Sequence, residues 1–223
     1  NAMRQTILHA RKAGMLVIAD CKRNDIGSTA EAYADAWLGE NRMPDGSAGV
    51  QFDADALTVN GYLGADGIDP FIRVCREHGK GIFILVRTSN PSAGDLQDLI
   101  LSDGRTVYEA MAGKVSLWGE GLAGDCGYSA VGAVVGATWP LQASKLRKLM
   151  PKAFILVPGY GAQGATALDA VSCFGPDGRG AIVNASRSLM LAWKKHQMPH
   201  EDFAAATRRE ALLMKADLRQ ALE

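Results

Sequence analysis

The chain has 223 residues, 48% of them hydrophobic, and its 24 basic residues balance its 24 acidic residues. This length and apolar content suit one globular domain with a hydrophobic core, so residues 1–223 are expected to form a single domain. A formal net charge of zero excludes a global field that would attract nucleic acid or an anionic membrane, so any anion site must be local.

No apolar run approaches the roughly 18 residues that a membrane span needs, and no secretory signal is visible. Asn1 and Ala2 resemble a cloning remnant and are left out of the expected fold. The cysteines lack C-x-x-C spacing, which argues against a zinc or redox motif and favours a reduced, cytoplasmic protein. They are Cys21, Cys75, Cys126 and Cys173.

Helical patterns alternate with short apolar runs along the chain. A helix is expected at residues 4–13 and a strand at 16–19; further strands are expected at 56–59, 82–86, 131–135, 154–157 and 181–183. The helices between and after them are expected at 28–38, 67–78, 105–118, 141–149, 164–174 and 202–222. Ser28 and Glu31 have the spacing of a capping box at the second helix. Residues 40–53 and 119–129 are rich in Gly and Asp, and this composition predicts loops.

The strand runs are near-continuously apolar, as in strands that are covered on both faces. Regular alternation of strands and helices predicts a parallel sheet, either doubly wound or closed as a (β/α)₈ TIM barrel. No G-x-G-x-x-G follows the first strand, which weighs against a dinucleotide-binding sheet. Polar and glycine residues instead follow nearly every strand, where barrel enzymes build their sites. We therefore expect an α/β barrel, with about six of its strands present.

The segment after the first strand carries the clearest chemistry. Asp20, Lys22 and Asp25 form a D-x-K-x-x-D pattern. Alternate residues of a strand face the same way, so Asp20 and Lys22 are expected to point together. A lysine among carboxylates keeps its proton, because opposite charge favours the ammonium form. The pattern therefore predicts a fixed proton donor at the end of a barrel strand.

Two later segments fit an anion site. Pro158 and Gly159 open a glycine-rich loop that reaches Gln163, and a helix is expected to begin at once after it. Glycines let backbone amides approach an anion, and a helix start offers it positive charge. Arg187 follows the last strand and could make a charge-assisted contact to the same phosphate. Barrel phosphate sites commonly lie after the last two strands, which agrees with these positions.

The stretch Ala19–Thr29 resembles the longer bacterial subgroup of the orotidine 5′-monophosphate decarboxylase family. The resemblance implies conversion of orotidine 5′-monophosphate (OMP) to uridine 5′-monophosphate (UMP) and CO₂ in pyrimidine biosynthesis, with no cofactor and no metal. It implies that Lys22 protonates C6 of the pyrimidine and that Asp20 lies against the scissile carboxylate. It further implies a homodimer in which Asp25 enters the neighbour's site and Thr29 lies at the interface. By the same resemblance, Ser89 contacts the pyrimidine, while Gln163 and Arg187 hold the phosphate.

The sequence departs from that family at its start. Two strands that normally precede the helix at 4–13 have no counterpart, nor do the aspartate and lysine that they carry. We therefore expect an N-terminally truncated barrel, stabilised by dimerisation or rearranged pairing and with little activity, because an opened barrel exposes strand edges.

Two alternative functions remain open. A sister enzyme of the same superfamily would share the motif and the phosphate loop but act on a sugar phosphate with Mg²⁺. The chain could also be a non-catalytic, phosphate-binding remnant. Ser89 and Gln163 favour the pyrimidine substrate, and no His, Cys and Asp cluster has metal-ligand spacing.

Overall fold

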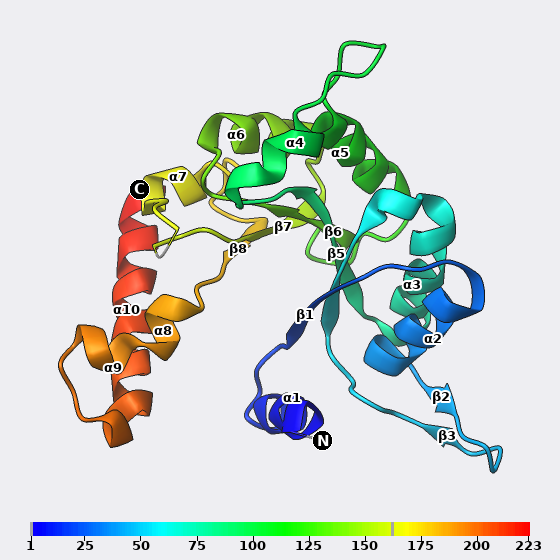
Figure 1. The fold of residues 1–223 in the computed structure, drawn as a ribbon, viewed down its shortest axis with the longest axis horizontal. Helices are drawn as coiled ribbons and strands as arrows, with labels where there is room; N and C mark the ends of the chain where they lie inside the picture. The colour runs from blue at the N-terminus through cyan, green and yellow to red at the C-terminus, as the bar shows by residue number, and fades with distance from the viewer. Residues whose placement is uncertain (1, 162) are drawn as a thin grey trace. The chain divides into compact units, whose positions relative to one another are not determined.

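A computed structural model describes residues 2–161 and 163–223. Its main sheet has six strands that neighbour one another in the order β1-β4-β5-β6-β7-β8 (Figure 1). The strands span Ile18–Arg23 (β1), Ala56–Val59 (β4), Gly81–Arg87 (β5), Ser129–Val135 (β6), Ala153–Val157 (β7) and Ala181–Val183 (β8).

The strand order decides between the two expected folds. Along the sheet it follows the chain order throughout, and β1–β4, β4–β5 and β7–β8 pair in parallel. A doubly wound sheet reverses its order at a switch point, whereas successive strands of a barrel are neighbours. The expected α/β barrel order, with six strands, is therefore confirmed.

The chain divides into two compact units. The first comprises the residues up to Val86, Met111–Ala133 and Lys152–Phe154. The second comprises Arg87–Ala110, Val134–Pro151 and Ile155–Glu223. Strands β5, β6 and β7 contribute residues to both units.

In the first unit, α3 (Ala65–His78) carries the main apolar stripe. Ile68, Phe71 and Val74 are fully buried, and α3 packs against α2 (Gly27–Leu38). Gly79 ends α3 in the left-handed conformation, as its position predicted. The expected capping box at Ser28 is wrong: Ile26 occupies the cap position, and no side chain caps the helix. The other helices that belong to this unit, wholly or for most of their length, are α1 (Ala2–Lys12), η1 (Gly61–Leu63) and α5 (Val107–Trp118).

Two differences from the expected elements lie in this unit. Strand β1 begins at Ile18 rather than at Leu16, which is 86% exposed, and it continues to Arg23. The expected loop at 40–53 contains a hairpin of β2 (Asn41–Arg42) and β3 (Ala48–Gly49). Strands of two residues are too short to show a periodic hydrophobic pattern in the sequence.

In the second unit, the long helix α10 (Phe203–Leu222) packs against α7, α8 and α9 (Figure 1). Helices α8 (Arg187–Met190) and α9 (Ala192–Lys195) were not predicted, because four residues form barely one turn. The remaining helices are η2 (Pro91–Ala93), α4 (Gly94–Gln97), α6 (Pro140–Leu149), α7 (Ala167–Val171) and η3 (His200–Asp202). In neither unit is any described helix long and apolar enough to cross a membrane.

Candidate active site

Asp20 and Lys22 lie side by side on β1. Lys22 Nζ is 2.6 Å from Asp20 Oδ1, as their alternation on the strand predicted. Lys22 has a positive φ of 49°, and the pairing of β1 with β4 shifts register between Ala19 and Arg23. A bulge of this kind re-aims side chains and is frequent beside active sites. Both side chains are more than half exposed, so the ion pair orients the ammonium group more than it stabilises the fold.

Thr58 on β4 supports this pair and was missed by the sequence reading. Its hydroxyl donates to Asp20 Oδ1 and accepts from the Lys22 main-chain N–H, both at 2.9 Å. Thr58 is fully buried. It is the polar residue of an otherwise apolar run, Ala56–Val59, and a buried hydroxyl needs partners. That single hydroxyl was the signal that could have identified it.

Cys21 lies between the two charged residues but is not suited to be a nucleophile. Burial raises the pKa of its thiol, and the charge of Asp20 adds to the shift, while Arg23 and Lys22 oppose it. A thiol with a raised pKa stays protonated at neutral pH and is a poor nucleophile.

Asp25 follows β1 in the loop that leads into α2. Its Oδ1 accepts a hydrogen bond from the Ile26 N–H at 2.9 Å, and the residue is half-buried. Within this chain Lys22 pairs with Asp20 and not with Asp25. Thr29 lies in the first turn of α2 and is exposed. The exposed Thr29 hydroxyl and the remaining acceptor capacity of the Asp25 carboxylate can thus serve groups outside this loop and helix.

Ser89 follows β5 in the second unit and lies in close contact with backbone. A Cβ atom on Gly136 would come within 2.8–2.9 Å of Ser89 atoms, and one on Gly159 within 3.3 Å. The contacts exclude a side chain at Gly136, and a positive φ of 103° disfavours one at Gly159. Thr138 Oγ1 lies 3.5 Å from Ser89 O, at the limit of a hydrogen bond. The half-buried Ser89 side chain is confined by these neighbours.

The expected phosphate loop is a tight turn after β7. Pro158 O accepts from Ala137 N at 2.8 Å, and Gly159 has a positive φ of 103°. Gly161 N donates to Ala165 O, and Gly164 N donates to Gly161 O. Gln163 is exposed, so its amide is free to meet a ligand.

The helix after this loop differs from the expectation. It begins at Ala167 rather than directly after Gly164, and it has only five residues. Thr166 and Asp169 form a capping box, in which Asp169 Oδ2 accepts from Thr166 N and Asp169 N donates to Thr166 Oγ1. The hydrogen bonds that the Thr166 N–H and hydroxyl donate to the carboxylate lower the pKa of Asp169. The expected start of this helix is therefore wrong, and a carboxylate caps its N-terminus.

Arg187 is the first residue of α8 and is exposed. None of the ion pairs found among residues 2–161 and 163–223 involves its guanidinium. The group could therefore bind a phosphate without first breaking a salt bridge.

The nine predicted residues divide between the units. Asp20, Lys22, Asp25 and Thr29 belong to the first, while Ser89, Pro158, Gly159, Gln163 and Arg187 belong to the second.

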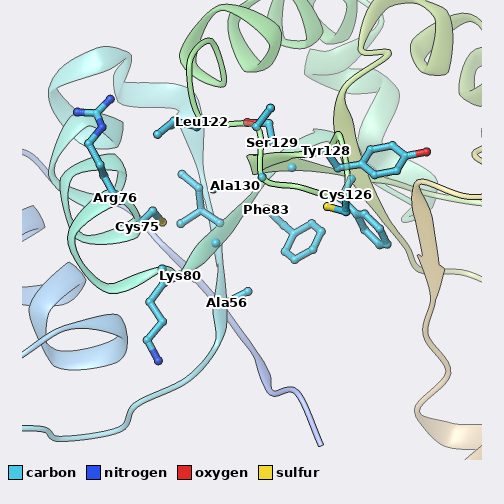
Figure 2. A pocket seen from close by; sticks show the side chains of 17 residues that line it. Ala56, Cys75, Arg76, Lys80, Phe83, Leu122, Cys126, Tyr128, Ser129 and Ala130 are labelled. Carbon is cyan, nitrogen blue, oxygen red and sulfur yellow. The ribbon is translucent and has the colours of Figure 1, made fainter.

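A separate cavity of about 520 Å³ lies in the first unit (Figure 2). Its wall includes Ala56 and Gly81, the first residues of β4 and β5, together with Cys75 and Phe83. Barrel active sites lie at the opposite, carboxyl ends of the strands. Burial raises the pKa of Cys75 to about 12, so its thiol stays protonated at neutral pH. This cavity holds none of the nine predicted residues.

Among the residues that the structure describes, no group of three or more His, Cys, Asp and Glu side chains could hold a metal ion. The four cysteines are free thiols.

Known proteins resemble this chain over most of its length. An orotidine 5′-phosphate decarboxylase from Rhodopirellula baltica is 50% identical over 193 residues, which cover 86% of this chain and 62% of that protein. One from Clostridium tetani is 40% identical over 221 residues, covering 99% of this chain and 73% of that protein. This chain thus spans less than two thirds of the length of the Rhodopirellula relative.

Solved structures agree with these relatives. The structure of Leishmania donovani OMP decarboxylase superposes with a TM-score of 0.67 at 32% identity, covering 92% of this chain and 74% of that chain. A family model described as the orotidine 5′-phosphate decarboxylase / HUMPS family matches residues 2–197. This chain therefore belongs to the orotidine 5′-phosphate decarboxylase / HUMPS family.

Proposed function

We propose that this chain decarboxylates OMP to UMP and CO₂, with Lys22 as the proton donor. The observation that carries the proposal is the 2.6 Å contact between Lys22 Nζ and Asp20 Oδ1. This contact fixes the position of the Lys22 Nζ group, the atom from which the proton would be delivered. The Thr58 hydroxyl supports it by donating a hydrogen bond to the same Asp20 oxygen.

The proposed reaction balances without a cofactor. The bond between C6 of the pyrimidine and the substrate carboxylate breaks, and its electron pair stays on C6. Lys22 Nζ gives its proton to C6 as CO₂ leaves and becomes a neutral amine. Asp20, which holds the ammonium group before the transfer, stays a carboxylate throughout. General acid catalysis by a positioned group typically contributes about 10²–10⁴-fold to the rate.

Substrate binding is assigned to the predicted residues of the second unit. We propose that Ser89 contacts the pyrimidine ring and that Pro158, Gly159, Gln163 and Arg187 surround the phosphate. The exposed Gln163 amide and the Arg187 guanidinium support this assignment, since both can donate to an anion. Binding energy from the phosphate can then hold the reacting carboxylate near Asp20 and Lys22.

We also propose a homodimer in which Asp25 serves the neighbour's site, with Thr29 at the interface. The absence of an ion pair between Asp25 and its own Lys22 supports this. The free cysteines favour a reducing, cytoplasmic setting, where such an enzyme would supply pyrimidine nucleotides.

The test follows the loss of OMP absorbance in the full-length gene product and in two variants. Lys22→Ala should lower kcat by at least about 10²-fold. Lys12→Ala, which removes an exposed lysine of α1, should leave kcat unchanged. Wild-type rates from Lys22→Ala would remove Lys22 from the mechanism. If OMP is inert and a sugar phosphate is consumed only with Mg²⁺, the sister activity of the superfamily replaces this proposal.

A further inference from the structure

Arg87, the last residue of β5, has a fully buried guanidinium. Its Cζ lies 4.2 Å from the ring centroid of Trp139 and 5.6 Å from that of Tyr108. Removing such a charge from water costs several kcal/mol, so a buried arginine needs compensating contacts. Stacking on aromatic rings supplies part of that compensation.

The hydrogen bonds of the Arg87 guanidinium supply another part of this compensation. Nη1 donates to Gln97 Oε1 at 3.2 Å, and Nη2 donates to Asp98 Oδ2 at 3.1 Å. Arg87 Nε is buried without a hydrogen-bond partner in the described structure. The Asp98 side chain is 47% exposed, which weakens its charge compensation. Replacing a buried ion pair by hydrophobic side chains is often neutral or stabilising, so a buried arginine is weak evidence for a role in stability.

The same contacts converge on the next residue, Thr88. Gln97 Oε1 accepts from Thr88 N at 3.0 Å as well as from Arg87, and Gln97 Nε2 donates to Thr88 Oγ1 at 2.8 Å. Trp139 Nε1 donates to Thr88 O at 3.0 Å. Thus both main-chain polar groups of Thr88 and its hydroxyl are held by two side chains that Arg87 contacts.

We propose that Arg87 is a positioning residue that fixes Ser89 for recognition of the pyrimidine. This proposal rests on the proposed function, in which Ser89 meets the base. Arg87 orients Gln97 and Trp139, these hold Thr88, and Thr88 directs the chain into Ser89. The space beside Ser89 is already limited by Gly136 and Gly159, so a small shift of Thr88 displaces the Ser89 hydroxyl.

The test compares ligands with and without the base. Arg87→Met keeps most of the length of the side chain and removes its charge, and Trp139→Phe keeps an aromatic ring and removes the donor to Thr88. Both should weaken UMP binding about tenfold, the loss expected for one well-made hydrogen bond. Both should leave ribose 5-phosphate binding unchanged. Arg87→Lys should recover part of the loss. Arg105→Met changes an exposed residue of the same segment, Arg87–Ala110, and should leave the affinities for UMP and ribose 5-phosphate unchanged.

A double-mutant cycle separates positioning from general destabilisation. If Arg87 acts through Ser89, Arg87→Met should add nothing in a Ser89→Ala background. Additive losses, or equal losses for UMP and ribose 5-phosphate, would overturn the proposal.

Amide exchange gives a readout that does not depend on the substrate. The Thr88 amide should lose protection in Arg87→Met and keep it in Arg105→Met. If the wild type binds no UMP, the proposed function fails, and this exchange result still decides whether Arg87 positions the segment. Full protection in Arg87→Met would refute it.

Discussion

The Thr58 hydroxyl donates a hydrogen bond to Asp20 Oδ1 at 2.9 Å from the neighbouring strand. Thr58 Oγ1 also accepts a hydrogen bond from the Lys22 main-chain N–H, so one buried hydroxyl fixes both members of the charged pair. Lys22 adopts a positive φ, which is uncommon for a residue with a side chain. The backbone at Lys22 therefore depends on a partner across the sheet.

Replacing Thr58 by Val should lower kcat, because the isosteric side chain cannot bridge Asp20 and Lys22. A hydrogen bond to a charged group contributes about 1.5–3 kcal/mol, which corresponds to a loss of about 10–100-fold in rate. Thr58→Ser keeps the hydroxyl and should retain most of the activity. Steady-state kinetics with thermal unfolding would separate this effect from a loss of fold. Equal rates for Thr58→Val and the wild type would contradict it.

Asp25 allows a test of the proposed shared site by subunit mixing. Lys22→Ala and Asp25→Asn should each be inactive alone. A dimer with one subunit of each kind holds one site in which an intact Lys22 meets an intact Asp25. Random exchange makes about half of the dimers mixed, so about a quarter of wild-type activity should return. If Asp25 serves its own subunit, mixing will restore nothing.

The contrast between β1 and β4 shows what local patterns could predict. The buried run Ala56–Val59 appears as a strand with the expected bounds, because continuous apolar residues demand cover on both faces. Strand β1 starts later and extends through the polar residues Asp20 and Lys22, which lie beyond the apolar run at 16–19 that predicted the strand. Its bulge depends on the partner strand, and pairing register is not a local property of a sequence.

The candidate site likewise has some features that local sequence patterns could predict and others that they could not. Asp20 and Lys22 could be predicted to lie together, because strand alternation alone brings them to one face. The lone hydroxyl of Thr58 in an apolar run could have marked the residue, but its partners on another strand could not be predicted. The Arg87 network could not be predicted either, because it depends on side-chain packing between separate segments. The helix after the phosphate loop was misplaced because the Thr166–Asp169 capping box sets its start, whereas apolar spacing suggested an earlier one.

Glu210 on α10 should make stability depend on acidic pH. Its carboxylate lies 2.6 Å from Lys195 Nζ and 2.9 Å from His196 Nε2, and the residue is 8% exposed. The hydrogen bond from Lys195, followed by that from His196, lowers the pKa of Glu210, although burial opposes the shift. The folded state thus favours the charged form, so the stabilisation is present above the ordinary glutamate pKa of about 4.3. It is lost as the pH falls through the folded-state pKa.

Glu210→Gln should therefore be less stable than the wild type at pH 7, by about 1–3 kcal/mol. The difference should close as the pH falls below about 4. Urea unfolding across this range measures it, with the exposed Glu201→Gln as control. A difference that stays constant with pH would show that Glu210 acts by packing alone.

Tyr160 joins the proposed phosphate loop to α10. Its hydroxyl donates to Asp217 Oδ2 at 2.6 Å. Burial raises the pKa of Tyr160, and the hydrogen bond and charge of Asp217 raise it further. The folded state therefore favours the neutral phenol. This stabilisation is complete below the ordinary tyrosine pKa of about 10 and is lost as the pH rises above it.

The unfolding free energy of the wild type should thus fall above about pH 10, because the unfolded chain ionises there while the folded one resists. Tyr160→Phe cannot ionise, so its curve should fall less steeply, although it should be less stable at neutral pH by about 1 kcal/mol. Urea unfolding from neutral to alkaline pH, with the exposed Arg219→Ala on the same helix as control, makes the comparison. Because the other tyrosines titrate in both proteins, the difference between the two curves isolates Tyr160. Parallel curves would mean that the Tyr160 hydroxyl ionises as readily in the folded protein as in the unfolded chain. The hydrogen bond to Asp217 would then not hold the loop against α10.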